Sequence, residues 1–231
     1  MKKLIKDGFS LTKGEFLLSL IVFAYLITSV SILQYPFAST YLLYIQAFFF
    51  LLENYITVCV YYGIKSSIWG EEIDVPVIFI KGMKFFGRVL AYKLLAGLFV
   101  IFVAAFCMSM VELVKDTAPI TAWSITAFTI LWLSFPVYVF LLTTFTPLVI
   151  ITDDIPLFPA IRKSVAFVKG NLLDIEKLVL LFLPLWLVVI FSLKLYNEKG
   201  FFLQFVILYL ISVLEVITVK VFLLFYRREV G

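Results

Sequence analysis

The sequence predicts an all-α integral membrane protein whose six transmembrane helices form three hairpins. Hydrophobic residues occupy 64% of the 231 positions and charged residues only 15%, and the mean hydropathy is +1.12. A soluble domain has roughly 25% charged residues, so this composition suits a chain whose outer surface faces hydrocarbon. Long apolar runs recur along the chain, and short basic segments lie between them.

Six apolar runs are long enough to cross the hydrocarbon core as helices, which takes about 20 residues each. They leave no polar stretch that could fold as a second domain, so residues 1–231 are expected to form one polytopic membrane domain. The runs are too long, and alternate too little, for β-barrel strands. The expected spans are Phe16–Leu33, Tyr41–Ile64, Val89–Val111, Ile125–Ile151, Leu178–Leu195 and Phe201–Tyr226.

The lysines and arginines predict the orientation, because cytoplasmic loops are enriched in both. An inside N-terminus places 16 of the 19 basic residues on the cytoplasmic side and leaves Lys115, Lys194 and Lys199 outside. We therefore expect a multi-pass protein of the cytoplasmic membrane with both termini in the cytoplasm. Because the basic residues lie in short loops and form no basic domain, nucleic acid is not expected as a partner.

A basic segment with helical spacing precedes each hairpin: Lys2–Lys13, Lys81–Arg88 and the segment that begins near Ile161. Such segments are typical of amphipathic helices that lie at the membrane surface, with their cations at anionic lipid headgroups. Their spacing of about 80 residues suggests three copies of one unit; alternatively, each is basic only because it is cytoplasmic. The apolar stripe of the third segment consists of Ile161, Val165, Val168 and Leu172.

The third cytoplasmic loop carries a recognisable pattern. Residues 147–154 read Pro-Leu-Val-Ile-Ile-Thr-Asp-Asp, residues 160–164 read Ala-Ile-Arg-Lys-Ser, and residues 168–171 read Val-Lys-Gly-Asn. The chain resembles a group of prokaryotic six-span proteins that includes the glycerophosphoryl diester phosphodiesterase membrane-domain family and related families of unknown function. The aromatic–arginine ending at residues 225–228 is also similar to theirs.

The resemblance implies six spans with interfacial or re-entrant elements on the cytoplasmic side, and it implies no activity. In the named family the phosphodiesterase chemistry belongs to a separate soluble domain, so it is not carried over to this chain. The aspartate pair is interpreted as helix capping or as a contact with a partner. The residues that carry the pattern are Asp153, Asp154, Ala160, Ser164, Lys169, Gly170 and Asn171.

Ionisable residues within the spans are the main candidates for function, because a charge in hydrocarbon is costly. Glu53 lies twelve positions before Lys65, and Glu215 lies twelve positions before Arg227. At 1.5 Å per residue, both are expected roughly 18 Å from the inner membrane edge, at one depth. Lys93 and Lys220 are the basic candidates within the spans, and both lysines are expected to extend toward the inner interface. The glutamates are interpreted either as interhelical hydrogen-bonding groups or as part of a transport path.

No catalytic residue, cofactor or metal site is expected. The chain contains no histidine, the commonest metal ligand and proton carrier near neutral pH. It also has no nucleophile-elbow, zincin or P-loop motif. Pro136 and Pro184 are expected to kink the fourth and fifth spans, which is a feature of some transporter sites and also of many membrane helices without such a role.

Two function classes remain open from the sequence. The first is a non-enzymatic membrane protein that acts through lipids or through a partner membrane or cytoplasmic protein. The second is a transporter of a small solute or ion, or the membrane subunit of one, that uses Glu53 and Glu215. A membrane enzyme that acts on lipid is a weaker third class.

Overall fold

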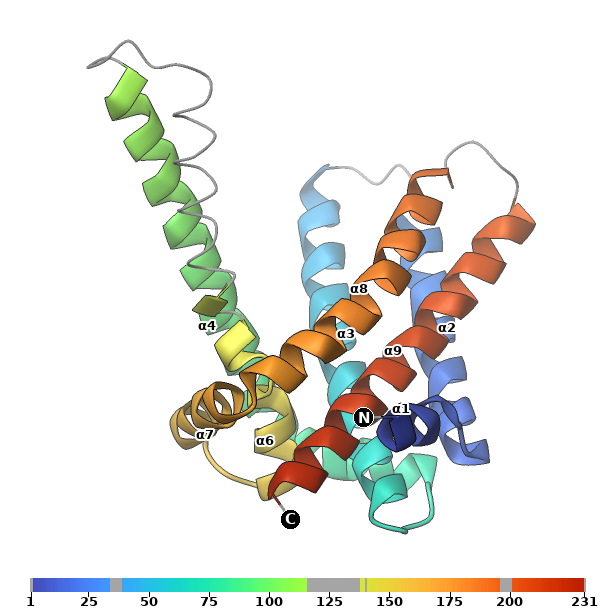
Figure 1. Ribbon diagram of the computed structural model, residues 1–231. Coiled ribbons are helices and arrows are strands. Elements are labelled where there is room, and N and C mark those ends of the chain that lie inside the picture. The colour runs from blue at the N-terminus through green and yellow to red at the C-terminus, as the bar shows by residue number, and fades with distance from the viewer. Residues whose placement is uncertain (1, 34–38, 116–137, 140, 196–200, 231) are drawn as a thin grey trace. The chain divides into compact units, whose positions relative to one another are not determined.

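The computed structural model describes residues 2–33, 39–115, 138–139, 141–195 and 201–230, and all regular elements within these ranges are α-helices (Figure 1). The chain divides into two compact units, one comprising Met1–Gly87 with Leu173–Gly231 and the other Arg88–Leu172. The helices are α1 Lys2–Phe9, α2 Lys13–Leu33, α3 Ser39–Ile68, α4 Val75–Lys115, α6 Thr146–Asp153, α7 Leu157–Gly170, α8 Leu172–Leu195 and α9 Phe201–Val230.

Four helical segments are long and apolar enough to cross a membrane: Lys13–Ile32, Tyr41–Ile68, Val75–Phe106 and Phe205–Val230. These segments confirm the all-α fold class and indicate a multi-pass membrane protein. They correspond to the first, second, third and sixth predicted spans. The fifth predicted span belongs to α8, which is not among the four, and much of the fourth lies outside the described residues, as does Pro136. Six spans therefore remain a prediction.

Helix α4 corrects one detail of the sequence prediction. The segment Lys81–Arg88 is helical, as expected, but it is continuous with the following span and is not a separate surface helix. The helix begins after Asp74, whose carbonyl accepts the Ile78 N–H at 2.9 Å. Pro76 lies in the first turn, where a missing N–H costs nothing. Lysine and arginine are good helix formers, so these charges interrupt the hydropathy of the chain but not its helical backbone.

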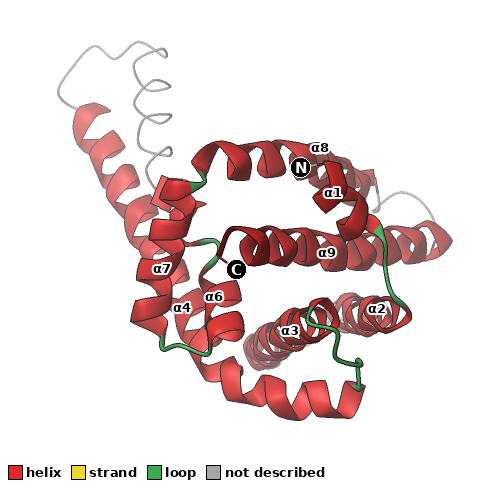
Figure 2. Ribbon diagram, turned by 60° about the horizontal axis from the view of Figure 1, so that its bottom comes forward, coloured by secondary structure: helices red, strands yellow, loops and turns green. Residues whose placement is uncertain are grey.

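In the first unit, α9 packs against α1, α2 and α3 (Figures 1 and 2). Helix α1 reaches α9 closely because Gly8 faces Val221, where a Cβ atom would overlap the valine side chain. The Cys59 sulfur lies against Gly82 in the same way, 2.9 Å from where a Cβ would be. Glycine at these two positions allows helix backbones to approach, which is the usual way that helices associate in membranes.

In the second unit, α6 packs against α7. The buried face of α7 consists of Ala160, Ser164, Phe167 and Val168, and the Phe145 and Phe167 rings lie 4.9 Å apart between centroids. The predicted stripe of Ile161, Val165, Val168 and Leu172 is therefore not the packed face: of these four residues only Val168 is buried. The packed face contains small Ala160 and Ser164, which permit close contact with α6.

Candidate functional site

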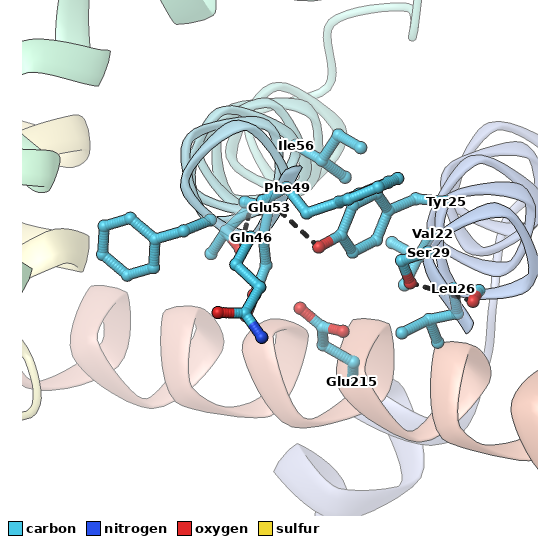
Figure 3. Close-up of a pocket in the computed structure, with 11 residues that line it drawn as sticks. Val22, Tyr25, Leu26, Ser29, Gln46, Phe49, Glu53, Ile56 and Glu215 are labelled. Carbon is cyan, nitrogen blue, oxygen red and sulfur yellow. Dashed lines mark hydrogen bonds between the residues drawn. The ribbon is translucent and has the colours of Figure 1, made fainter. Parts of the chain in front are cut away.

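The two glutamates that the sequence singled out line one pocket in the first unit. The pocket lies among α2, α3 and α9 and has a volume of about 350 Å³. Glu53 belongs to α3 and Glu215 to α9, so the two carboxylates come from helices far apart in the sequence. Figure 3 shows the side chains that line this pocket.

Helix α2 contributes one wall of the pocket. Val22, Tyr25, Leu26 and Ser29 follow the spacing i, i+3, i+4, i+7 and therefore share one face of the helix. The Tyr25 hydroxyl donates a hydrogen bond to the Phe49 carbonyl of α3 at 3.2 Å. The phenol also interacts electrostatically with the carboxylates of both glutamates. Tyr25 thus connects α2 to α3 in the wall of the pocket.

Helix α3 supplies Gln46, Phe49 and Glu53 to the opposite wall, and Gln46 and Glu53 lie two turns apart on one face. The Gln46 amide therefore lines the same pocket as the Glu53 carboxylate. Asn54, which follows Glu53 in the chain, does not line the pocket; it is buried and donates to the Phe50 carbonyl at 2.6 Å.

The pocket carries negative charge. The residues described as lining it include two glutamates and neither lysine nor arginine. Glu53 is exposed and Glu215 half-buried, so both carboxylates are accessible. Two carboxylates that line one pocket repel each other when both are ionised, and a positively charged ligand bound between them reduces that repulsion. The arrangement is suited to binding positive charge.

Lys220 lies apart from this pocket, in a buried ion pair. Its ammonium group donates to Glu15 Oε2 at 2.7 Å and to the Ser10 carbonyl at 2.5 Å. The lysine side chain is 8% exposed and the glutamate side chain 0%. Lys220, which the sequence predicted to extend toward the inner interface, is buried and bound by a carboxylate and a carbonyl at the start of α2. Lys93 is half-buried in the second unit and does not line the pocket.

The sequence interpretation missed Glu15, although the sequence contained a signal for it. Thr12 and Glu15 form a capping box at the start of α2. The Thr12 N–H donates to Glu15 Oε2 at 2.8 Å, and the Glu15 N–H donates to the Thr12 hydroxyl at 3.3 Å. Within the described part of the chain, the other carboxylate oxygen, Oε1, is buried without a hydrogen-bond partner. Glu15 therefore caps α2 and binds Lys220 through the same oxygen.

The second unit contains a break between helices, and this break explains why the pattern of the third cytoplasmic loop includes Ser164. Helix geometry is interrupted by a turn at residues 144–145, before α6, so the predicted fourth span Ile125–Ile151 is not one continuous helix. Pro147 has no N–H to donate to the Thr143 carbonyl. The Tyr92 hydroxyl donates to that carbonyl at 2.8 Å, and the Ser164 hydroxyl donates to the Leu142 carbonyl at 2.9 Å. Ser164 is thus a structural residue of the break.

The aspartates of the loop bind cations of their own unit. Asp153 pairs with Lys163 at 2.8 Å, and Asp154 pairs with Arg88 at 2.8 Å. Asp154 follows α6 in the left-handed conformation, with φ at 52°. Arg88 also donates to the Ile155 carbonyl at 3.0 Å, so it holds the turn between α6 and α7.

The rest of the pattern marks the end of α7. Gly170 is its last residue, and the Asn171 N–H donates to the Phe167 and Val168 carbonyls as a C-cap. Ala160 is fully buried and Lys169 is exposed. Pro184 lies inside α8, and the helix continues through it. The structure brings none of these residues into the pocket between α2, α3 and α9.

No family model, curated protein or solved structure matches the chain. The resemblance to six-span prokaryotic proteins therefore stays a prediction. The helices define the class, a multi-pass membrane protein, and its function must be argued from the pocket.

Proposed function

We propose that this chain is a non-enzymatic protein of the cytoplasmic membrane that binds a small positively charged solute in the pocket between α2, α3 and α9 and moves it across the bilayer, alone or as the membrane subunit of a transporter. In this proposal the chain spans the membrane six times with both termini in the cytoplasm. The excess of basic residues in the connections assigned to the inside supports that topology.

The observation that carries the proposal is that Glu53 and Glu215 line one accessible pocket. Their equal distances in sequence from Lys65 and Arg227 are consistent with a position near the middle of the bilayer. A role limited to hydrogen bonding between helices would need no open pocket beside the carboxylates. A pocket of about 350 Å³ has room for a ligand, since small-molecule sites begin at about 300 Å³.

Charge movement in proteoliposomes tests the proposal. The purified protein is reconstituted and adsorbed to a solid-supported membrane, and Na⁺, K⁺ and tetraethylammonium are added in turn. We expect at least one cation to produce a current that the Glu53→Gln/Glu215→Gln variant abolishes. The control, Glu112→Gln/Glu176→Gln, removes the same charge from two exposed positions and is expected to leave the current unchanged. Equal currents from the wild type, the pocket variant and empty liposomes would refute the proposal.

A second candidate function, an anionic-lipid-binding module, is favoured by a different observation. A hollow of about 330 Å³ lies between α1 and the end of α9, lined by Lys3, Leu4, Asp7, Leu224 and Arg228. Lys3 and Arg228 provide two cations beside apolar leucines, which suits a phosphorylated headgroup and its acyl chain. Native mass spectrometry with phosphatidylglycerol and phosphatidylcholine tests it. Selective retention of phosphatidylglycerol that is lost in Lys3→Gln/Arg228→Gln, but not in Lys6→Gln/Lys177→Gln, is the expected result.

A further inference from the structure

We propose that the ligand of the pocket between α2, α3 and α9 is an organic ammonium ion, a protonated amine or a quaternary ammonium with short apolar groups, and not a metal ion. This inference rests on the proposed function, because it assumes that the pocket binds a cation. It adds the chemical class of that cation.

The supply of oxygen ligands in the pocket is poor for a metal ion. Calcium takes about six to eight oxygen ligands and magnesium about six. Apart from the two carboxylates, the side-chain oxygens that line the pocket are neutral ones from Tyr25, Ser29, Gln46 and Thr57, and the Ser29 and Thr57 hydroxyls donate to the Leu26 and Glu53 carbonyls at 3.0 and 2.8 Å. In the described residues, no group of three or more histidines, cysteines, aspartates or glutamates is placed to hold a metal. Among the residues described as lining the pocket, the two glutamates are therefore the only charged oxygen ligands that a metal ion would find.

The walls of the pocket are mainly apolar, and this matches the carbon atoms of an organic cation. Val22, Leu26 and Ile56 contribute aliphatic surface, and Phe49 and Tyr25 contribute aromatic surface. A hydrated metal ion gains nothing from such walls. The alkyl groups of an ammonium ion gain about 25 cal/mol for each Å² of apolar area removed from water.

Two aromatic rings stand beside the carboxylates. The Tyr25 and Phe49 rings lie 6.2 Å apart between centroids, with an angle of 51° between their planes, and Figure 3 shows both beside the space that Glu215 faces (Figure 3). Aromatic faces attract alkylammonium groups through cation–π interactions and are the usual lining of quaternary ammonium sites. Carboxylates and aromatic faces together therefore recognise both the charge and the alkyl surface of one ligand.

The size of the pocket agrees with this class of ligand. Its volume of about 350 Å³ lies near the lower end of small-molecule sites, which range from about 300 to 1,000 Å³. A single dehydrated metal ion would leave most of that space to water. A compact ammonium ion with short alkyl groups fills much more of it.

Binding to the purified protein in nanodiscs tests the inference, with isothermal titration calorimetry as the measurement. The probes are tetraethylammonium, butylammonium, Na⁺, K⁺ and Ca²⁺ at one ionic strength. We expect the two ammonium ions to bind and the three metal ions to bind at least tenfold more weakly. We expect Glu53→Gln/Glu215→Gln to lose ammonium binding, and Glu112→Gln/Glu176→Gln to retain it.

The aromatic contribution has its own test. Phe49→Leu keeps an apolar side chain but removes the ring, and we expect it to weaken tetraethylammonium binding by about two- to thirtyfold, the range that cation–π energies imply. Thermal unfolding of each variant shows whether the fold is intact. If a metal ion binds and the ammonium ions do not, the inference is overturned while the proposed function stands. If none of the five cations binds to the folded wild type, the proposed function fails as well.

Discussion

Replacing Lys220 by methionine should destabilise the protein strongly, because it removes one partner of a buried ion pair. Methionine keeps the length and apolar stem of the lysine but not its charge. In the variant, the fully buried Glu15 carboxylate would keep the Thr12 N–H as a donor and lose the ammonium group at 2.7 Å. The Ser10 carbonyl would also lose its donor at 2.5 Å.

The burial of the pair determines how much free energy of unfolding Lys220→Met should lose. Removing one partner of a buried ion pair costs about 3–5 kcal/mol, chiefly because the remaining charge stays buried without compensation. Replacing Glu15 by glutamine in the same chain removes that charge and keeps an oxygen that can accept from Thr12. The double variant Glu15→Gln/Lys220→Met should therefore lose only about 1–2 kcal/mol, the cost of imperfect hydrogen bonding.

The assay is the free energy of unfolding in detergent micelles, measured by SDS titration and followed by circular dichroism for the wild type, both single variants and the double variant. Each single variant leaves the other group buried without its partner, so the two single losses should sum to more than the loss in the double variant, and the double-mutant cycle should give a coupling of at least about 2 kcal/mol. Lys177→Met serves as the control, because its pair with Asp174 is exposed and exposed pairs contribute little to stability. A loss below about 1 kcal/mol for Lys220→Met, or no coupling in the cycle, would refute the reasoning.

Three further predictions follow from individual contacts. Tyr92→Phe removes the donor to the Thr143 carbonyl at the helix break and should cost about 1–3 kcal/mol in the same unfolding assay; no change would mean that another donor replaces it. Gly8→Val should separate α1 from α9, because its side chain overlaps the α9 surface; faster amide hydrogen exchange in α1 is the expected result, and unchanged protection would contradict it. Lys177 holds the pKa of Asp174 below its usual value through a hydrogen bond and its charge, so Lys177→Met should raise the pKa in a carbon-13 NMR titration. Because the folded-state pKa is lowered, the small stabilisation by this pair is present above the usual aspartate pKa and is lost as the pH falls through the lowered one.

Four of the long helices were predictable from the sequence because each contains an apolar run long enough to cross a membrane. The predicted Phe16–Leu33 and the observed α2 share their last residue, and α2 begins only three residues earlier. The start was misplaced because Lys13 and Glu15 lower the hydropathy of a turn that is nevertheless helical. For the same reason the charged start of α4 was assigned to a separate helix.

The candidate site was predictable only in part. Equal distances from basic residues placed Glu53 and Glu215 at one depth, but depth does not determine which way a side chain points around a helix axis. Tyr25 gave no signal, because a tyrosine in an apolar span is ordinary. The pairing of Glu15 with Lys220 was not predictable, because the two residues are 205 positions apart and nothing in the sequence links their helices.

The separation of Glu15 and Lys220 has a consequence for biosynthesis. At about 5–20 residues per second, the ribosome needs roughly 10 to 40 s to proceed from one residue to the other. Throughout this interval the first long helix has been made while its acidic end still lacks the lysine that neutralises it. Synthesis of α9 therefore supplies the counter-charge, and a nascent chain that stops before α9 presents a carboxylate without its lysine partner at the start of its first long helix.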